Sequence, residues 1–279
     1  ITIRNATTGQ NVRFNSITSN SLSYAQSGGL GGIVCTNGTN PLGITHTNTF
    51  SNNTITLTNT GTTAITGIDF GAGLSTGTIV SSNNNITINQ NATAATSAAV
   101  IGIKANYASA TNTCSSNTVV FNQSNTTGAL SSATTGITLS GAGTTLTANS
   151  NSVTINQTGS GTATITGAVI GIDYSAAATT INSLSNTVLV NQTTSVASGI
   201  TNAITGIKAT TASTTVNIGS SGSGNTITVK QAFTGSGTYA SGAITYVDLG
   251  TTGHGTANVL YNTFNTTGST IRSAGSLIG

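Results

Sequence analysis

Short runs in which polar residues alternate with Ile, Val or Leu recur along the whole chain. Such alternation is typical of half-buried β-strands, and no window carries a convincing helical pattern. One recurring run starts at an Asn and ends at an amide, as in "SNTVLVNQ" (185–192) and "SNSVTINQ" (150–157). A second carries Gly-Ile, as in "IGIDY" and "TGIKA", and a third, fainter run such as "TTLTA" (144–148) precedes each Asn. The pattern predicts three short strands in each repeat.

The spacing of the second run predicts the architecture. Its central apolar residues lie about 35 residues apart, at Ile33, Ile68, Ile103, Ile137, Ile172, Ile207 and Val247. Strands that repeat at this period without intervening helices favour a solenoid, in which each strand pairs in parallel with its copy one coil away. A β-propeller has a similar period but needs four antiparallel strands per blade. We therefore expect an all-β fold, a right-handed parallel β-helix of about eight coils with three short strands each, formed by residues 1–279 as one β-solenoid.

Amides recur in phase with the apolar residues of the first run. Asn151 and Gln157 share strand parity with Val153 and Ile155, so their side chains are expected to point inward. Stacked amides can hydrogen-bond along a column, which satisfies buried polar groups with their own copies. We expect two structural amide ladders, and a ligand-binding amide row is the weaker alternative. The ladders are Asn53, Asn84, Asn117, Asn151, Asn186 and Asn225, and Asn59, Gln90, Gln123, Gln157, Gln192 and Gln231.

The strands "SNTVLVNQ" and "AITGIKA", whose variants cover the whole chain, resemble those of right-handed parallel β-helix proteins of the pectin-lyase-like type. A closer resemblance is to long Thr/Asn/Gly-rich surface proteins of Bacteroidota-type bacteria, which are commonly exported by type IX secretion. This resemblance implies an extracellular or cell-surface location. Pectin-lyase-like enzymes, as the resemblance implies, use clustered carboxylates on one face, often with Ca²⁺ and a basic residue.

The few charges of the chain fall in one phase of the repeat. All three acidic residues, Asp69, Asp173 and Asp248, directly follow the central Ile or Val, and Lys104 and Lys208 occupy the same position in other coils. A stacked column of one sign would repel itself, whereas alternating signs avoid that penalty and disfavour a slipped register. We expect these five residues to form an exposed structural charge ladder, in which Asp69 lies beside Lys104 and Lys208 lies between Asp173 and Asp248.

This placement leaves no acidic residue for an active site, because the chain has no Glu and no fourth Asp. Asp173 and Asp248 are separated by a coil that carries Lys208, which suits neither a glycosidase carboxylate pair nor a multi-oxygen Ca²⁺ site. We predict no catalytic residue, no metal and no cofactor. The expected function is a non-enzymatic, extracellular structural or adhesive segment of a surface protein or fibre. A carbohydrate-binding or polysaccharide-degrading β-helix is the alternative.

The remaining candidate groups favour structural roles. His46 and His254 lie near opposite ends of the solenoid, so a shared zinc site is less favoured than loop or surface positions. Cys35 and Cys114 are expected two coils apart as buried thiols that do not pair. An outward Thr/Asn face could bind ice, although Val120 interrupts it, and an ice-binding solenoid is a minor alternative.

Charge, hydropathy and the chain ends limit the partners. A net charge of +3 spread over 279 residues forms no basic stripe, which argues against nucleic acid, and no apolar run is long enough to span a membrane. The end "SLIG" resembles "AVIG" before Ile172, and "ITIRN" resembles "IDYSA", so we expect the repeat to continue. The expected partners are other solenoid copies or the rest of a longer chain, with surface glycans as a further candidate.

Overall fold

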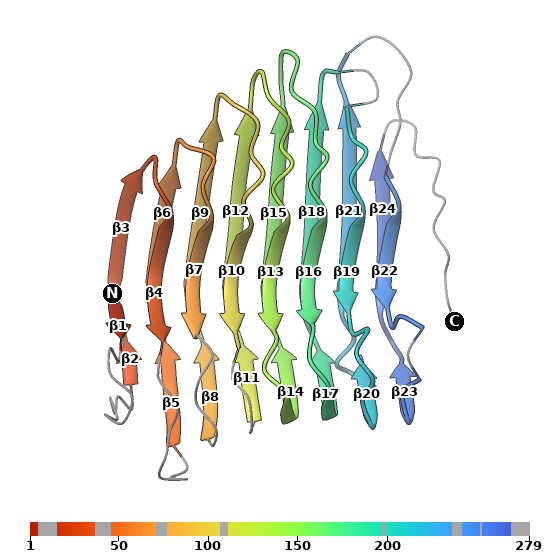
Figure 1. The fold of residues 1–279 in the computed structure, drawn as a ribbon. Coiled ribbons are helices and arrows are strands. Elements are labelled where there is room, and N and C mark those ends of the chain that lie inside the picture. Colours follow the sequence, from red (N-terminus) through yellow and green to blue (C-terminus); the bar gives the residue numbers. More distant parts are fainter. Residues whose placement is uncertain are drawn as a thin grey trace.

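The computed structural model describes residues 1–4, 16–36, 46–70, 77–106, 111–196, 199–235, 242–251 and 253–268. These residues form an all-β fold of three parallel sheets, and the described part contains no helix. Successive strands belong to the three sheets in turn, so one strand from each sheet makes one turn of a β-solenoid (Figure 1). The first turn, with β1, and the last, with β22, lie at opposite ends of the stack. The predicted fold class is therefore confirmed.

The three sheets, named A, B and C here, contain eight strands each. Sheet A contains β1 (Thr2–Arg4), β4 (Leu30–Thr36), β7 (Ile65–Phe70), β10 (Val100–Ala105), β13 (Thr134–Leu139), β16 (Val169–Tyr174), β19 (Ile204–Lys208) and β22 (Ile244–Asp248). Sheet B contains β2 (Ser16–Thr18), β5 (His46–Ser51), β8 (Gly77–Ser82), β11 (Thr111–Ser115), β14 (Gly143–Asn149), β17 (Ala178–Leu184), β20 (Thr215–Ile218) and β23 (Thr256–Val259). Sheet C contains β3 (Ser21–Gln26), β6 (Thr54–Asn59), β9 (Asn85–Ala92), β12 (Thr118–Asn125), β15 (Ser152–Gly159), β18 (Thr187–Thr194), β21 (Thr226–Phe233) and β24 (Thr263–Gly268).

Six turns, from β4 to β21, have a neighbouring turn on both sides, and the first and last turns form the two edges. The stack thus amounts to about six enclosed turns, a small difference from the predicted eight coils. Every strand pairing is parallel and joins residues one repeat apart, such as Ile137 with Ile172 and Val153 with Val188. Each side chain therefore lies beside its own copy in the adjacent turn.

The core is a continuous column of Ile, Val and Leu enclosed by the three sheets. Residues alternate between buried and partly exposed along sheets B and C, as strand geometry requires. In sheet A the alternation is interrupted, since both Gly171 and Ile172 are buried in the middle of β16. The glycine marks a place where sheet A approaches its neighbours closely.

That approach explains why glycine recurs in sheet A. A Cβ placed on Gly171 would lie 2.5 Å from the carbonyl oxygen of Gly206 in the next turn and 2.6 Å from Val188 Cγ1 in sheet C. Carbon atoms do not approach backbone oxygens this closely without displacing them, so a side chain here has no room. The same holds for the equivalent glycines of the other enclosed turns, which are Gly32, Gly67, Gly102, Gly136 and Gly206. We call these six residues the glycine column.

We predict that Gly171→Ala lowers the free energy of unfolding by at least about 2 kcal/mol, because the added methyl group overpacks a backbone contact that cannot yield. Gly253→Ala is the matched control, since a Cβ there meets no atom within 4 Å. Chemical denaturation should place the control within about 0.5 kcal/mol of the parent. Equal stabilities of the two variants would contradict the close approach.

Candidate functional site

The charged residues singled out in the sequence lie in one outward column of sheet A. Strand register sets Asp69 opposite Lys104, and Lys208 opposite both Asp173 and Asp248. Thr138 separates the two groups, because it pairs with Lys104 on one side and with Asp173 on the other. The column therefore runs through successive turns, with acidic and basic residues adjacent to one another.

Only part of this column forms ion pairs. Lys104 Nζ lies 3.7 Å from Asp69 Oδ2, and this is the one salt bridge within the part of the chain that the structure describes. Asp248 Oδ1 instead accepts a hydrogen bond from the backbone N–H of Gly250 at 2.8 Å, so this carboxylate is used by its own turn. The Lys208 side chain thus lies in the column between two carboxylates without a salt bridge to either.

The expectation that this column is exposed was wrong. The side chains of Asp69 and Lys104 are only 21% and 34% exposed, and Asp173, Lys208 and Asp248 are also partly buried. Burial raises the pKa of the Asp69 carboxyl, although Lys104 opposes the shift. Burial likewise raises the pKa of the Asp173 carboxyl, and Lys208 opposes it. In both residues Oδ1 is buried and has no hydrogen-bond partner, so the charged form is incompletely compensated.

Asparagine side chains stack through the corner between sheets B and C. Each backbone N–H and side-chain Nδ2 donates to Oδ1 of the asparagine in the next turn; Asn151, for example, donates to Asn186 Oδ1 at 3.0 Å from both nitrogens. Nδ2 of Asn151 also donates to the carbonyl oxygen of Cys114 in the preceding turn at 2.9 Å. One asparagine therefore connects three turns. The column, called the Asn ladder, is Asn20, Asn53, Asn84, Asn117, Asn151, Asn186, Asn225 and Asn262.

The two end members of the Asn ladder, Asn20 and Asn262, were missing from the predicted set. In the first turn the run "FNSITSNS" (14–21) also resembles the first strand, but its Asn15 lies outside the described residues. The copy that contains Asn20 is "SNSLSYAQ" (19–26), which keeps the spacing from the Asn to the terminal amide. The residue before most ladder asparagines is left-handed, with φ between 53° and 58° at Ser19, Asn52, Asn83, Ser116, Ser150, Ser185 and Tyr261. A Ser or Asn directly before a candidate asparagine could therefore have helped to identify the members of the Asn ladder from the sequence.

Glutamines form a second buried column at the far end of sheet C. Nε2 of Gln123, Gln157, Gln192 and Gln231 each donates to Oε1 of the glutamine in the preceding turn, at 2.7–2.9 Å. Asn59 does not join this column, contrary to the expectation. Its side chain is one methylene shorter than Gln, and Nδ2 donates to the carbonyl oxygen of Gly28 at 3.0 Å. As a result Gln90 Nε2 is buried without a partner.

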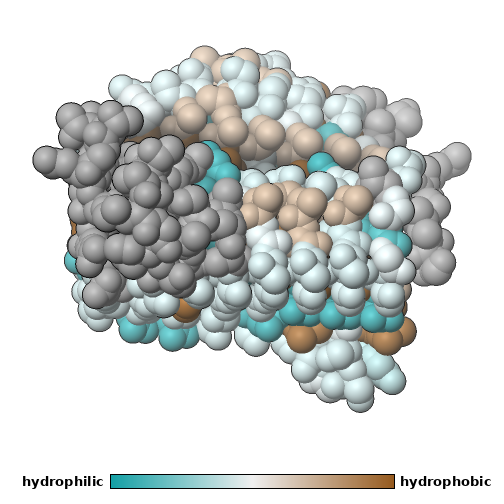
Figure 2. All heavy atoms as spheres, turned by 60° about the horizontal axis from the view of Figure 1, so that its bottom comes forward, coloured by the Kyte–Doolittle hydropathy of each residue, from teal (hydrophilic) through white to brown (hydrophobic). Residues whose placement is uncertain are grey.

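Further amide columns lie on the outer surface, where the sequence suggested only a Thr/Asn face. On sheet C, Asn122, Asn156 and Asn191 each donate from Nδ2 to Oδ1 of the asparagine one turn earlier, at 2.8–3.0 Å. On sheet B, Asn217 and Asn258 do the same. Figure 2 shows residues of like hydropathy in rows along the stack, as this repetition requires.

The histidines and cysteines do not form a reactive cluster in the described residues. His254 Nδ1 accepts from the backbone N–H of Ser213 at 3.2 Å, and Nε2 lies 3.1 Å from the Leu249 carbonyl oxygen, so this ring is held by backbone groups. The side chains of His46 and Cys35 lie outside the described part. Cys114 is a free, buried thiol, and burial raises its pKa to about 12.

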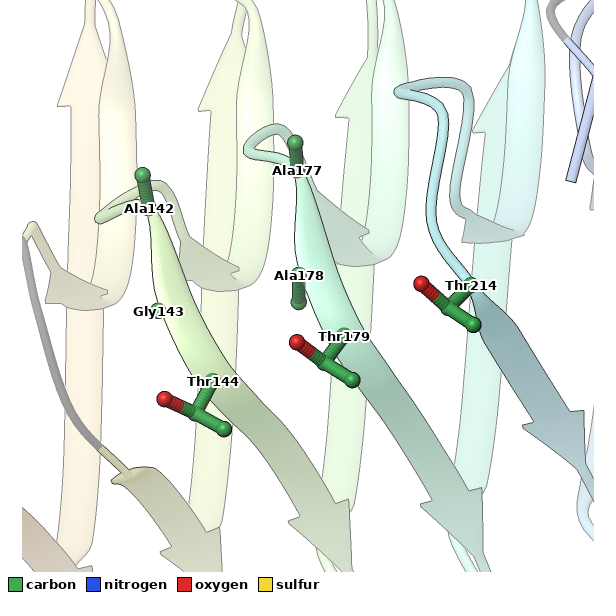
Figure 3. A pocket seen from close by; sticks show the side chains of 7 residues that line it. All are labelled: Ala142, Gly143, Thr144, Ala177, Ala178, Thr179 and Thr214. Carbon is green, nitrogen blue, oxygen red and sulfur yellow. The ribbon is translucent and has the colours of Figure 1, made fainter. Parts of the chain in front are cut away.

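Two shallow grooves are among the concave surfaces of the described part. One, of about 390 Å³, lies where sheet B begins, and Thr144, Thr179 and Thr214 line it with the same orientation in successive turns (Figure 3). The other, of about 400 Å³, lies between β18, β21 and β24 and is lined by Asn191, Gln192, Thr193, Lys230, Gln231, Ala232 and Thr267. Both offer hydroxyl or amide groups, and neither contains a carboxylate.

No protein-family model matches the chain, and neither the search of curated proteins nor that of solved structures found a match. None of the described residues belongs to a helix with the length and apolar character needed to cross a membrane.

We predict that Asn151→Ala lowers the free energy of unfolding by about 3 kcal/mol, because the two nitrogens of neighbouring Asn117 lose their buried acceptor. Asn156→Ala in the same strand breaks two similar side-chain bonds at the surface, to Asn122 and from Asn191, where water replaces them, and should cost less than about 1 kcal/mol. Equilibrium denaturation measures both. Similar losses in the two variants would show that burial of the Asn ladder does not matter.

The raised pKa values of Asp69 and Asp173 predict a stability that depends on pH. Below the ordinary carboxyl pKa of 3.8 the folded and unfolded states are both protonated, and burial carries no charge penalty. As pH rises above 3.8, the unfolded state ionises first, so stability falls until the folded-state pKa is passed. Thermal melts should show this loss, and Asp69→Asn with Asp173→Asn should reduce it. Thr138→Ser, in the same column, should keep the parent profile.

Proposed function

We propose that the chain is a non-enzymatic structural or adhesive repeat segment of an extracellular protein, either a cell-surface protein or a fibre. The observation that carries the proposal is the placement of the acidic residues. Asp173 and Asp248 are separated by Lys208 within one column, and Asp69 is paired with Lys104. Glycoside hydrolysis by a carboxylate pair and Ca²⁺ binding both need carboxylates that converge on one point, and these do not.

The stack itself supports a mechanical role. Buried asparagines connect each turn to the turns on both sides, and buried glutamines connect sheet C along the same axis. Parallel strands add backbone hydrogen bonds in the same direction. A rod whose turns are joined by three sets of axial bonds suits a spacer that holds other parts of a molecule at a distance.

The extracellular assignment rests on the resemblance to long Thr/Asn/Gly-rich surface proteins of Bacteroidota-type bacteria, for which type IX secretion would be the route. In that setting the partners would be other solenoids, the rest of a longer chain, or surface glycans. A surface made of Thr and Asn, with few charges, is compatible with all three.

A carbohydrate-binding or polysaccharide-degrading β-helix is the second candidate, and the groove beside Lys230 favours it. Its amides and hydroxyls could hydrogen-bond sugar hydroxyls, and Lys230 could contact an acidic sugar. The groove is open and has no aromatic platform among its lining residues. Titration with neutral and uronic-acid oligosaccharides, using the parent and Lys230→Ala, distinguishes this candidate, since loss of a saturable signal in the variant would support it.

The structural proposal predicts that the protein cleaves no polysaccharide. A panel of pectic and neutral glycans should give background rates with the parent chain and with the triple variant Asp69→Asn, Asp173→Asn, Asp248→Asn. Reducing-end assays and product chromatography measure cleavage, while circular dichroism checks that the variant is folded. Cleavage by the parent that the triple substitution abolishes would refute the proposal.

A further inference from the structure

The glycine column ends at a tyrosine. The register of β19 and β22 pairs Thr205 with Thr245 and Ile207 with Val247, which places Tyr246 opposite Gly206. A Cβ on Gly206 would lie 2.6 Å from the carbonyl oxygen of Tyr246 and 2.7 Å from Ile227 Cγ2. The last described turn therefore has a tyrosine at the position where all six enclosed turns have glycine.

The Tyr246 side chain packs toward sheet C, where the enclosed turns have no room for a side chain. Its ring stacks on that of Phe264 in sheet C, with centroids 4.9 Å apart and an interplanar angle of 22°. Phe264 is the copy of Ile227 in the last turn, so the tyrosine meets the counterpart of the residue that a Cβ on Gly206 would strike. The two rings join sheets A and C and pack against the core at this end.

Other columns at this end have polar and apolar groups that a further turn could still contact. In earlier turns the backbone N–H of each ladder asparagine donates to the next asparagine, as Asn225 does to Asn262 at 2.9 Å. Within the described residues no acceptor meets the N–H of Asn262. At the other end no described group donates to Asn20 Oδ1. One end of the ladder thus offers a donor and the other an acceptor, so the ladder itself would allow a further turn or a second copy to be added. Val247 and Val259 are also only partly buried.

From these contacts we propose that Tyr246, together with Phe264, terminates the stack. The Cβ of Tyr246 would meet the backbone oxygen of any further turn that kept the spacing of the enclosed turns, and the stacked ring could not leave without exposing the core. The proposal applies whether the further turn belongs to a longer chain or to a second copy. It is independent of the proposed function and runs against the expectation that the repeat continues past this end.

The test adds one turn to the full chain. Because "SLIG" resembles "AVIG" before Ile172, a copy of residues 172–206 joined to Gly279 continues the repeat. Two extended chains are compared, one with Tyr246 and one with Tyr246→Gly, which restores the glycine column. The extended Tyr261→Ser chain is the matched control, since Tyr261 belongs to the same turn but is exposed and lies outside the column.

Limited thermolysin digestion followed by intact-mass measurement reports whether the added turn packs. We expect the added residues to be trimmed from the Tyr246 and Tyr261→Ser chains. In the Tyr246→Gly chain they should survive at least about 10-fold longer, because cleavage of a packed turn requires local opening. Equal survival with Tyr246 and with Gly at this position would overturn the proposal, and so would rapid trimming of all three chains. The unchanged mass of the preceding turns verifies folding in each case.

Discussion

At each corner between sheets B and C, one backbone N–H and the two N–H groups of a buried amide must find acceptors away from water. The asparagine of the next turn and a backbone carbonyl of the preceding turn supply them. An unpaired buried donor costs about 1–3 kcal/mol, so this arrangement is stable only when turns are stacked in register. A shift by one residue would place every ladder asparagine on the outer face and leave its partners unsatisfied. The position of the strands, and hence of the charge column, follows from this requirement.

Sheet A contributes the second constraint. Glycines such as Gly171 allow a strand to approach the next turn and sheet C more closely than any side chain permits. Two residues after the glycines of their own strands, the carboxyls of Asp69 and Asp173 are partly buried and lose part of their hydration. The lysines beside them reduce this cost only in part. The charged column therefore disfavours a wrong strand register, but burial of its carboxylates costs stability that the lysines only partly restore.

Much of the fold could be predicted from the sequence because a repeat presents the same pattern many times. Strand parity was sufficient to place Asn151 and Gln157 inward, since each shares a face with Val and Ile. The sequence could not show that Asn59 is too short to reach Gln90, because this depends on the loop near Gly28. The recurring Gly-Ile pair was visible, but the role of the glycine was not, since it depends on atoms of another turn. Partial burial of the aspartates was missed for the same reason.

The amide columns differ in direction. In the bonds between amide side chains, the N–H groups of the buried asparagines point toward the C-terminal end, whereas those of the glutamines and of the outer asparagines point toward the N-terminal end. The dipoles of these columns therefore oppose one another along the axis, whereas peptide dipoles in an α-helix all add up. The axial dipole of such a stack therefore grows less with each added turn than it would if all the amide columns ran in one direction. Opposed columns thus limit the electrostatic effect that gaining or losing a turn has on the rest of the stack.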